Sequence, residues 1–189
     1  MGAAGDMLTA ALLELIPDKQ AFLEEMNGLG LPGVHVEMEG AVKCGVTGTH
    51  VRVTVHGQEE ESLDDHDHHH HDADHQHDHA HDHEHEHHHE HDHEHDHDHD
   101  HHHDHPHHHT SVKDIEALLS GLPVSDRVKA DAKAVYDLIA RAESRVHGHP
   151  ISEIHFHEVG TLDAVADVVA VCLLMEKIAP DQVICSPVH

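Results

Sequence analysis

The spacing of apolar residues divides the first third of the chain into helices and strands. Apolar residues recur every three or four positions over 6–16, which predicts an amphipathic helix. A second helix is predicted over 17–28, because a proline suits the first turn and a glycine suits the end. Strict alternation of apolar and polar residues follows over 34–38 and 51–55, with glycines at 45 and 48 between them. This pattern is typical of two half-buried strands joined as a hairpin.

Helical spacing dominates the last third of the chain. Ser111 with Asp114 three residues later resembles a capping box, so a short helix is predicted from there to Gly121. Longer helices are predicted over 125–146 and 162–177, and a strand over 183–185. The fold class is therefore predicted to be mixed α+β, with a small sheet packed against helices.

Between these two parts the apolar pattern stops. Residues 66–109 hold 26 of the 34 histidines and 14 of the 38 acidic residues. A segment with so little to bury cannot offset the entropy lost on ordering, so 58–109 is predicted to be a disordered insertion. The flanking ranges, 1–57 and 110–189, are predicted to be the two halves of one globular domain, and the second half is predicted to end in the strand.

Composition excludes several classes of protein. The formal net charge is -28 and there are only three aromatic residues, so a nucleic-acid partner is not expected. No apolar run reaches the roughly 20 residues of a membrane span and no signal peptide pattern opens the chain, so we expect a cytoplasmic protein without a membrane partner. The three cysteines show no CxxC spacing, which argues against a disulfide framework or a zinc ribbon.

The insertion has the chemistry of a metal-binding segment. Neutral imidazole suits nickel, copper, zinc and cobalt, while carboxylates add oxygen donors, so alternating them gives many overlapping weak sites. The tract alone does not select the metal. A purification tag or a solvated linker are the alternatives, but this segment is internal and interleaved with acids. The candidate metal ligands are His81, His83, His85, His87, His88, His89, His91, His93, His95, His97, His99, His101, His102 and His103.

A second group of candidate functional residues follows the sequence HFHE. His155 and His157 project to one side of an extended segment, and Asp163 and Asp167 share one face of the next helix. With Glu158 they are the candidate catalytic residues, because such a set suits a metal ion or a metal-bound nucleotide phosphate. The alternative is that Asp163 caps the helix, Asp167 is solvated and the histidines lie on the surface of a loop.

The start of the chain offers a third candidate. In GAAGDM, small residues precede a helix, and Gly5 and Asp6 are the predicted cofactor-binding residues because helix N-termini accept anions that can approach closely. Asp6 could instead be an ordinary N-cap.

These segments together resemble the LarC family of nickel insertion proteins. The resemblance rests on GAAGDM with LTAALLEL, on the His-rich insertion, on HFHEVGTLDAVADVV and on ICSPVH. It implies insertion of nickel into pyridinium-3,5-bisthiocarboxylic acid mononucleotide, the precursor of the nickel-pincer cofactor of lactate racemase. Metal–carbon and metal–sulfur bonds form in a reaction that uses CTP and a divalent cation, magnesium or manganese. Such an enzyme is a nickel cyclometallase, or chelatase, of the lyase class.

The resemblance also implies that this chain is the N-terminal portion of a longer protein. The CTP chemistry would then belong to a C-terminal domain or a second polypeptide, and a homo-oligomer is possible. On this hypothesis the tract acquires nickel and presents it to the HFHE group. Two alternatives stay open: a nickel storage protein or metallochaperone without catalysis, and an interaction module with a charged linker.

Overall fold

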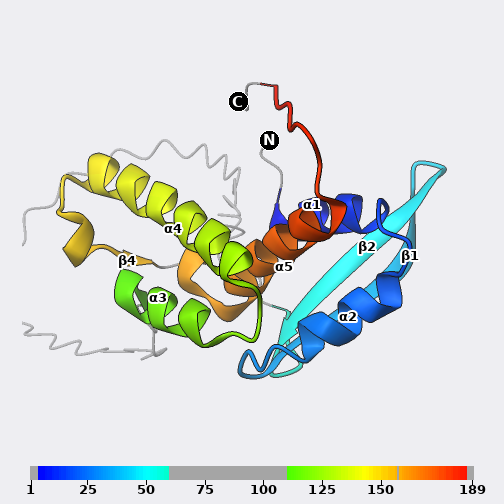
Figure 1. The fold of residues 1–189 in the computed structure, drawn as a ribbon, viewed down its shortest axis with the longest axis horizontal. Helices are drawn as coiled ribbons and strands as arrows, with labels where there is room; N and C mark the ends of the chain where they lie inside the picture. The colour runs from blue at the N-terminus through cyan, green and yellow to red at the C-terminus, as the bar shows by residue number, and fades with distance from the viewer. Residues whose placement is uncertain (1–3, 60–109, 157, 187–189) are drawn as a thin grey trace, which may run out of the picture. The chain divides into compact units, whose positions relative to one another are not determined.

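The computed structural model describes residues 4–59, 110–156 and 158–186, which belong to one compact unit. Its helices and two small antiparallel sheets confirm the predicted α+β class (Figure 1). From residue 60 onward the predicted disordered insertion lies outside the described residues. None of the helices in the described ranges is both long and apolar enough to cross a bilayer.

The first half contains the predicted helix pair and hairpin. Helices α1 (Gly5–Leu13) and α2 (Lys19–Asn27) precede strands β1 (Val34–Lys43) and β2 (Val46–Val55). The strands are longer than predicted, because the turn is the two-residue Cys44–Gly45, with φ of 52° and 78°. Two consecutive left-handed residues suit a tight hairpin turn. The alternation of side chains fades near the tip, where nothing is buried, but backbone pairing continues.

The second half contains the predicted helices α3 (Val112–Gly121), α4 (Asp126–His147) and α5 (Leu162–Ile178). The capping box is confirmed: the Asp114 backbone N–H donates to the Ser111 hydroxyl at 3.3 Å, and the Ser111 backbone N–H donates to the Asp114 carboxylate at 3.0 Å. These bonds satisfy donors that a helix start leaves unpaired, which is why the helix begins there.

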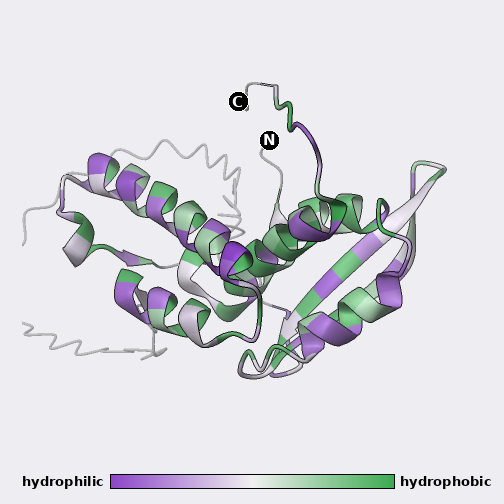
Figure 2. Ribbon diagram, in the orientation of Figure 1, coloured by the Kyte–Doolittle hydropathy of each residue, from purple (hydrophilic) through white to green (hydrophobic). Residues whose placement is uncertain are grey.

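Helix α5 lies at the centre of the core. It contacts α1, α4 and both hairpin strands, and residues such as Val165, Val169 and Leu174 are fully buried on it. Figure 2 shows the consequence, with α5 hydrophobic over most of its surface and α4 polar on its outer side. A helix that is apolar nearly all round is stable only when other elements surround it.

A second sheet was not predicted. Strands β3 (Thr110–Ser111) and β4 (His155–Phe156) pair antiparallel, with Thr110 opposite Phe156 and Ser111 opposite His155. The 3-10 turns η1 (Ile151–Glu153) and η2 (Glu158–Gly160) flank β4. Two-residue strands are too short to show any periodicity, so only the folded chain reveals this pairing.

The strand predicted over 183–185 is absent. Residues 182–186 carry no strand or helix assignment, and Val183 and Ile184 are 67% and 85% exposed. The residues have high β-propensity, but propensity alone does not make a strand when no neighbouring strand pairs with it. The prediction that the second half ends in a strand was therefore wrong.

Candidate functional site

The glycine-rich start of the chain meets the aspartates of α5. A Cβ built on Gly5 would lie 2.5 Å from the Asp167 Cβ and 2.6 Å from its Oδ2. The backbone N–H of Asp6 donates a hydrogen bond to the Asp167 carboxylate. Two motifs from opposite ends of the chain are thus joined, because α1 packs along α5 (Figure 1). Only glycine permits so close an approach.

Asp6, Asp163 and Asp167 form what we call the acidic cluster. Asp163 lies one turn before Asp167 on α5 and accepts a hydrogen bond from the Thr161 hydroxyl. Burial, followed by the charges of Asp6 and Asp163, raises the pKa of Asp167 to about 7. The Asp167 Oδ1 atom is buried without a hydrogen-bond partner. Like charges held close together with little solvent cannot all ionise freely, so the cluster attracts protons or cations.

This arrangement predicts a pH-dependent stability. The pKa of Asp167 is higher in the folded protein than in the unfolded chain, so the folded state binds more protons between about pH 4 and 7. Rising pH therefore lowers the free energy of unfolding across that interval. Asp167→Asn should match the wild type near pH 4 and exceed its stability at pH 8 by roughly 1 kcal/mol, a discounted value because the carboxyl is partly solvated.

Thermal denaturation of both proteins from pH 4 to 8 measures this difference. Asp114→Asn is the control for the general loss of a carboxylate. Hydrogen bonds from Ser111 lower the pKa of Asp114, so this variant should be less stable than the wild type at pH 8, the opposite of Asp167→Asn. If the difference in stability between Asp167→Asn and the wild type does not change with pH, the pKa of Asp167 is not raised in the folded protein.

His155 occupies a different setting. It is exposed on β4, opposite Ser111. Hydrogen bonds from Ser111 lower the pKa of Asp114, and the charge of His155 lowers it further, so His155 is close to Asp114. Asp114 was predicted only as a capping residue. Its proximity to His155 depends on the β3–β4 pairing, for which no sequence signal exists.

Tyr136 on α4 contacts the strand that carries His155. Its ring packs against Phe156 of β4, with ring centroids 5.6 Å apart and planes at 55°. Burial, and then the charges of Asp163 and Asp167, raise the pKa of its hydroxyl, so the aspartates are nearby. Tyr136 was not among the predicted site residues, because in the sequence it looks like one apolar position of a helix stripe.

Part of the predicted site cannot be placed. His157, the side chain of Glu158 and the tract histidines lie outside the described residues. Within the described part of the chain, no three His, Cys, Asp or Glu side chains already converge as metal ligands. The structure therefore unites Gly5, Asp6, Asp163 and Asp167, while a joint metal site with the histidines stays a prediction.

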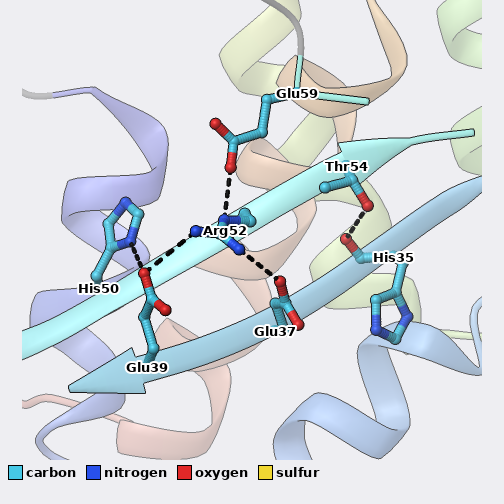
Figure 3. Close-up of polar contacts among 7 residues, drawn as sticks. All are labelled: His35, Glu37, Glu39, His50, Arg52, Thr54 and Glu59. Carbon is cyan, nitrogen blue, oxygen red and sulfur yellow. Dashed lines mark hydrogen bonds and ion pairs between the residues drawn. The ribbon is translucent and has the colours of Figure 1, made fainter. Parts of the chain in front are cut away.

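The hairpin carries a separate polar network (Figure 3). Arg52 forms ion pairs with Glu37 at 3.1 Å, Glu39 at 3.3 Å and Glu59 at 2.5 Å, and Glu39 also contacts His50 at 3.1 Å. A groove of about 770 Å³ lies over this face and is lined by none of the predicted site residues. Three carboxylates neutralise the guanidinium, and exposed ion pairs contribute little energy, so the network adds little to the stability of the hairpin.

Comparison with known proteins identifies similar chains. The family model described as nickel insertion protein matches residues 1–189. Proteins named pyridinium-3,5-bisthiocarboxylic acid mononucleotide nickel insertion protein are 32% identical in Clostridium kluyveri, over 100% of this chain, and 35% identical in Lactiplantibacillus plantarum, over 98% of it. The chain spans 38% of the length of each of these two relatives. No solved structure matches the chain significantly.

Proposed function

Because this chain belongs to the nickel insertion protein family, we propose that it collects nickel on the tract 66–109 and delivers it beside the HFHE segment. There the ion would be inserted into pyridinium-3,5-bisthiocarboxylic acid mononucleotide, the compound in the names of its relatives. The reaction proposed for the whole protein is that of a CTP-dependent nickel chelatase.

One observation carries this proposal. Thr110, the residue directly after the tract, pairs with Phe156, and Ser111 pairs with His155. The ligand-rich segment is thus covalently continuous with a strand that is hydrogen-bonded to the HFHE segment. Transfer from the tract to this segment would be effectively intramolecular, which raises the local nickel concentration most when free nickel is scarce.

The chemistry of the described residues fits cationic ligands. Nickel and a pyridinium ring are both positively charged, and the acidic cluster provides a concentration of negative charge. His155 adds an imidazole donor suited to nickel. These residues would bind and orient the reactants, and a carboxylate such as Asp167 could take up a proton released when nickel replaces hydrogen.

The acidic cluster repels phosphates unless a cation is present. Carboxylate oxygens suit magnesium or manganese, so Asp163 and Asp167 are the described donors that would hold such an ion, which would neutralise phosphate charge. We assign CTP binding to a region beyond this chain, since the relatives are much longer.

A second candidate function is nickel storage or delivery without insertion. It is favoured by the finding that no three metal ligands converge within the described residues. For that function the tract would suffice, and the HFHE segment would be incidental.

Measuring nickel insertion by the full-length protein with His155 and His157 both changed to Ala separates insertion from storage or delivery. We expect the variant to keep the nickel stoichiometry of the tract but to lose insertion at least tenfold, because the ligands at the receiving segment are gone. The matched control changes His147 and His149 to Ala, an exposed pair with the same spacing at the end of α4. Equal insertion by the two variants would favour storage.

A further inference from the structure

The backbone of β1 presents an outer edge that faces away from β2. The side-chain amide of Asn27 marks this edge, because it donates to the Val36 carbonyl and accepts from the Val36 N–H, both at 2.8 Å. Val36 therefore directs its backbone groups outward. Alternate residues of a paired strand direct these groups to the same edge, so Met38, Gly40 and Val42 also direct theirs outward.

The outer edge of β1 is open beyond Val36. In the part of the chain that the structure describes, no hydrogen bond occupies the outward N–H and C=O groups of Met38, Gly40 and Val42. A Cβ built on Gly40 would meet nothing within 4 Å. The edge of β2 is different, because β2 contacts α1 and Val55 pairs with Gln58. An exposed row of free backbone groups is a template for another strand.

This open edge is complementary to a second copy of itself. It contains three free residues, bounded by the capped Val36 and by the Cys44–Gly45 turn. Two copies paired antiparallel use all three residues only when Gly40 lies opposite Gly40. Met38 of each copy then lies opposite Val42 of the other, and these apolar side chains are 37% and 72% exposed in the single chain. Pairing would remove part of that apolar surface from water.

The same register matches the charges on the other face of β1. Glu37 of each copy lies opposite Lys43 of the other, and Glu39 lies opposite Ala41. Opposite charges across a strand pair are favourable, whereas like charges are unfavourable. The Glu37 side chain is 48% exposed beside Arg52, which leaves it open to a second cation. A shift of the two-fold centre to Glu39 would instead place two glutamates opposite each other.

We propose that two copies of the chain associate through residues 38–42 of β1, with a two-fold axis at Gly40. Their hairpins then form one antiparallel sheet of four strands. The turn of each copy falls opposite Val36 of the other, beside a groove of about 570 Å³ between α2 and β1. Figure 1 shows the tip of the hairpin extending past α2. Association closes at two copies, because the same edge is used on both sides of the axis.

Sedimentation equilibrium of the 189-residue chain measures this association. EDTA is present throughout, so that metal ions cannot bridge the histidine tracts. We expect a monomer–dimer equilibrium in the wild type and at least tenfold weaker association in Gly40→Pro, because proline removes an outward N–H from each copy. The hairpin should stay intact, since this N–H does not bond to β2. Thr47→Pro is the matched control, because it removes an outward N–H from the opposite edge.

Charge variants test the register independently of proline. Lys43→Glu and Glu37→Lys should each weaken self-association roughly tenfold, because each places like charges opposite one another twice. An equal mixture of the two variants should associate as the wild type does, since every facing pair then has opposite charges. A wild type that stays monomeric at every concentration overturns the inference, and so does equal weakening by Gly40→Pro and Thr47→Pro. A mixture that associates no better than its components overturns the two-fold register.

Discussion

Deleting residues 66–109 is expected to abolish nickel insertion when nickel is limiting and to leave it nearly unchanged when nickel is saturating. The tract holds 26 histidines, and on the proposed function it would raise the local concentration of the ion without taking part in the chemistry. Insertion should be measured at both nickel concentrations, with calorimetric titration of nickel, cobalt and zinc alongside. Several weak sites should vanish on deletion, and a tighter site that requires His155 and His157 should survive.

The control for this deletion replaces the tract histidines by Gln, which keeps its length and its acidic residues. This variant should behave like the deletion, because carboxylates alone are poor ligands for nickel. Wild-type nickel binding should also fall below about pH 6.5, where the imidazoles become protonated. Complete loss of binding with the tract would make storage or delivery the better account of the chain.

Gly5→Val is expected to damage both the stability and the site. Its Cβ would lie 2.5 Å from the Asp167 Cβ, a distance that non-bonded carbons do not tolerate, so α1 and α5 must separate. Forcing extra carbon atoms into a packed contact costs about 1–3 kcal/mol. The hydrogen bond from Asp6 to Asp167 should be lost with it. We expect a lower melting temperature and at least a tenfold loss of insertion by the full-length protein.

Gly121→Val is the control for this substitution. A Cβ at Gly121 meets nothing within 4 Å, and the residue is exposed at the end of α3. The control should change stability by no more than about 0.5 kcal/mol and leave insertion intact. If Gly5→Val behaved in the same way, the contact between Gly5 and Asp167 would not hold the site together.

Local sequence signals were sufficient for the helices and the hairpin. Two helix starts were marked by serines, Ser111 before α3 and Ser125 before α4. The structure confirms both, because the backbone N–H groups of Asp114 and Val128 donate to the hydroxyls of these serines. Capping involves residues three apart, so it is readable without knowledge of the fold. The strand at 183–185 failed for the converse reason, since a strand needs a pairing partner that no local pattern supplies.

The candidate site was only partly predictable. Asp163 and Asp167 could be placed on one helix face from their spacing, but nothing in that spacing indicated that Gly5 would lie against Asp167. Tyr136 and Asp114 were missed because one is an aromatic residue in a helix stripe and the other a capping residue. Their positions depend on packing between elements that are far apart in the sequence.

Residue type and short-range order were enough to predict the mixed fold class, which the structure confirms, while metal binding by the tract stays a prediction. The family resemblance rested on short sequence motifs, which are also local. The acidic cluster, the raised pKa of Asp167 and the unpaired Tyr136 hydroxyl arise differently. They depend on which side chains are brought together and shielded from water, and long-range packing of α1, α4 and α5 controls that.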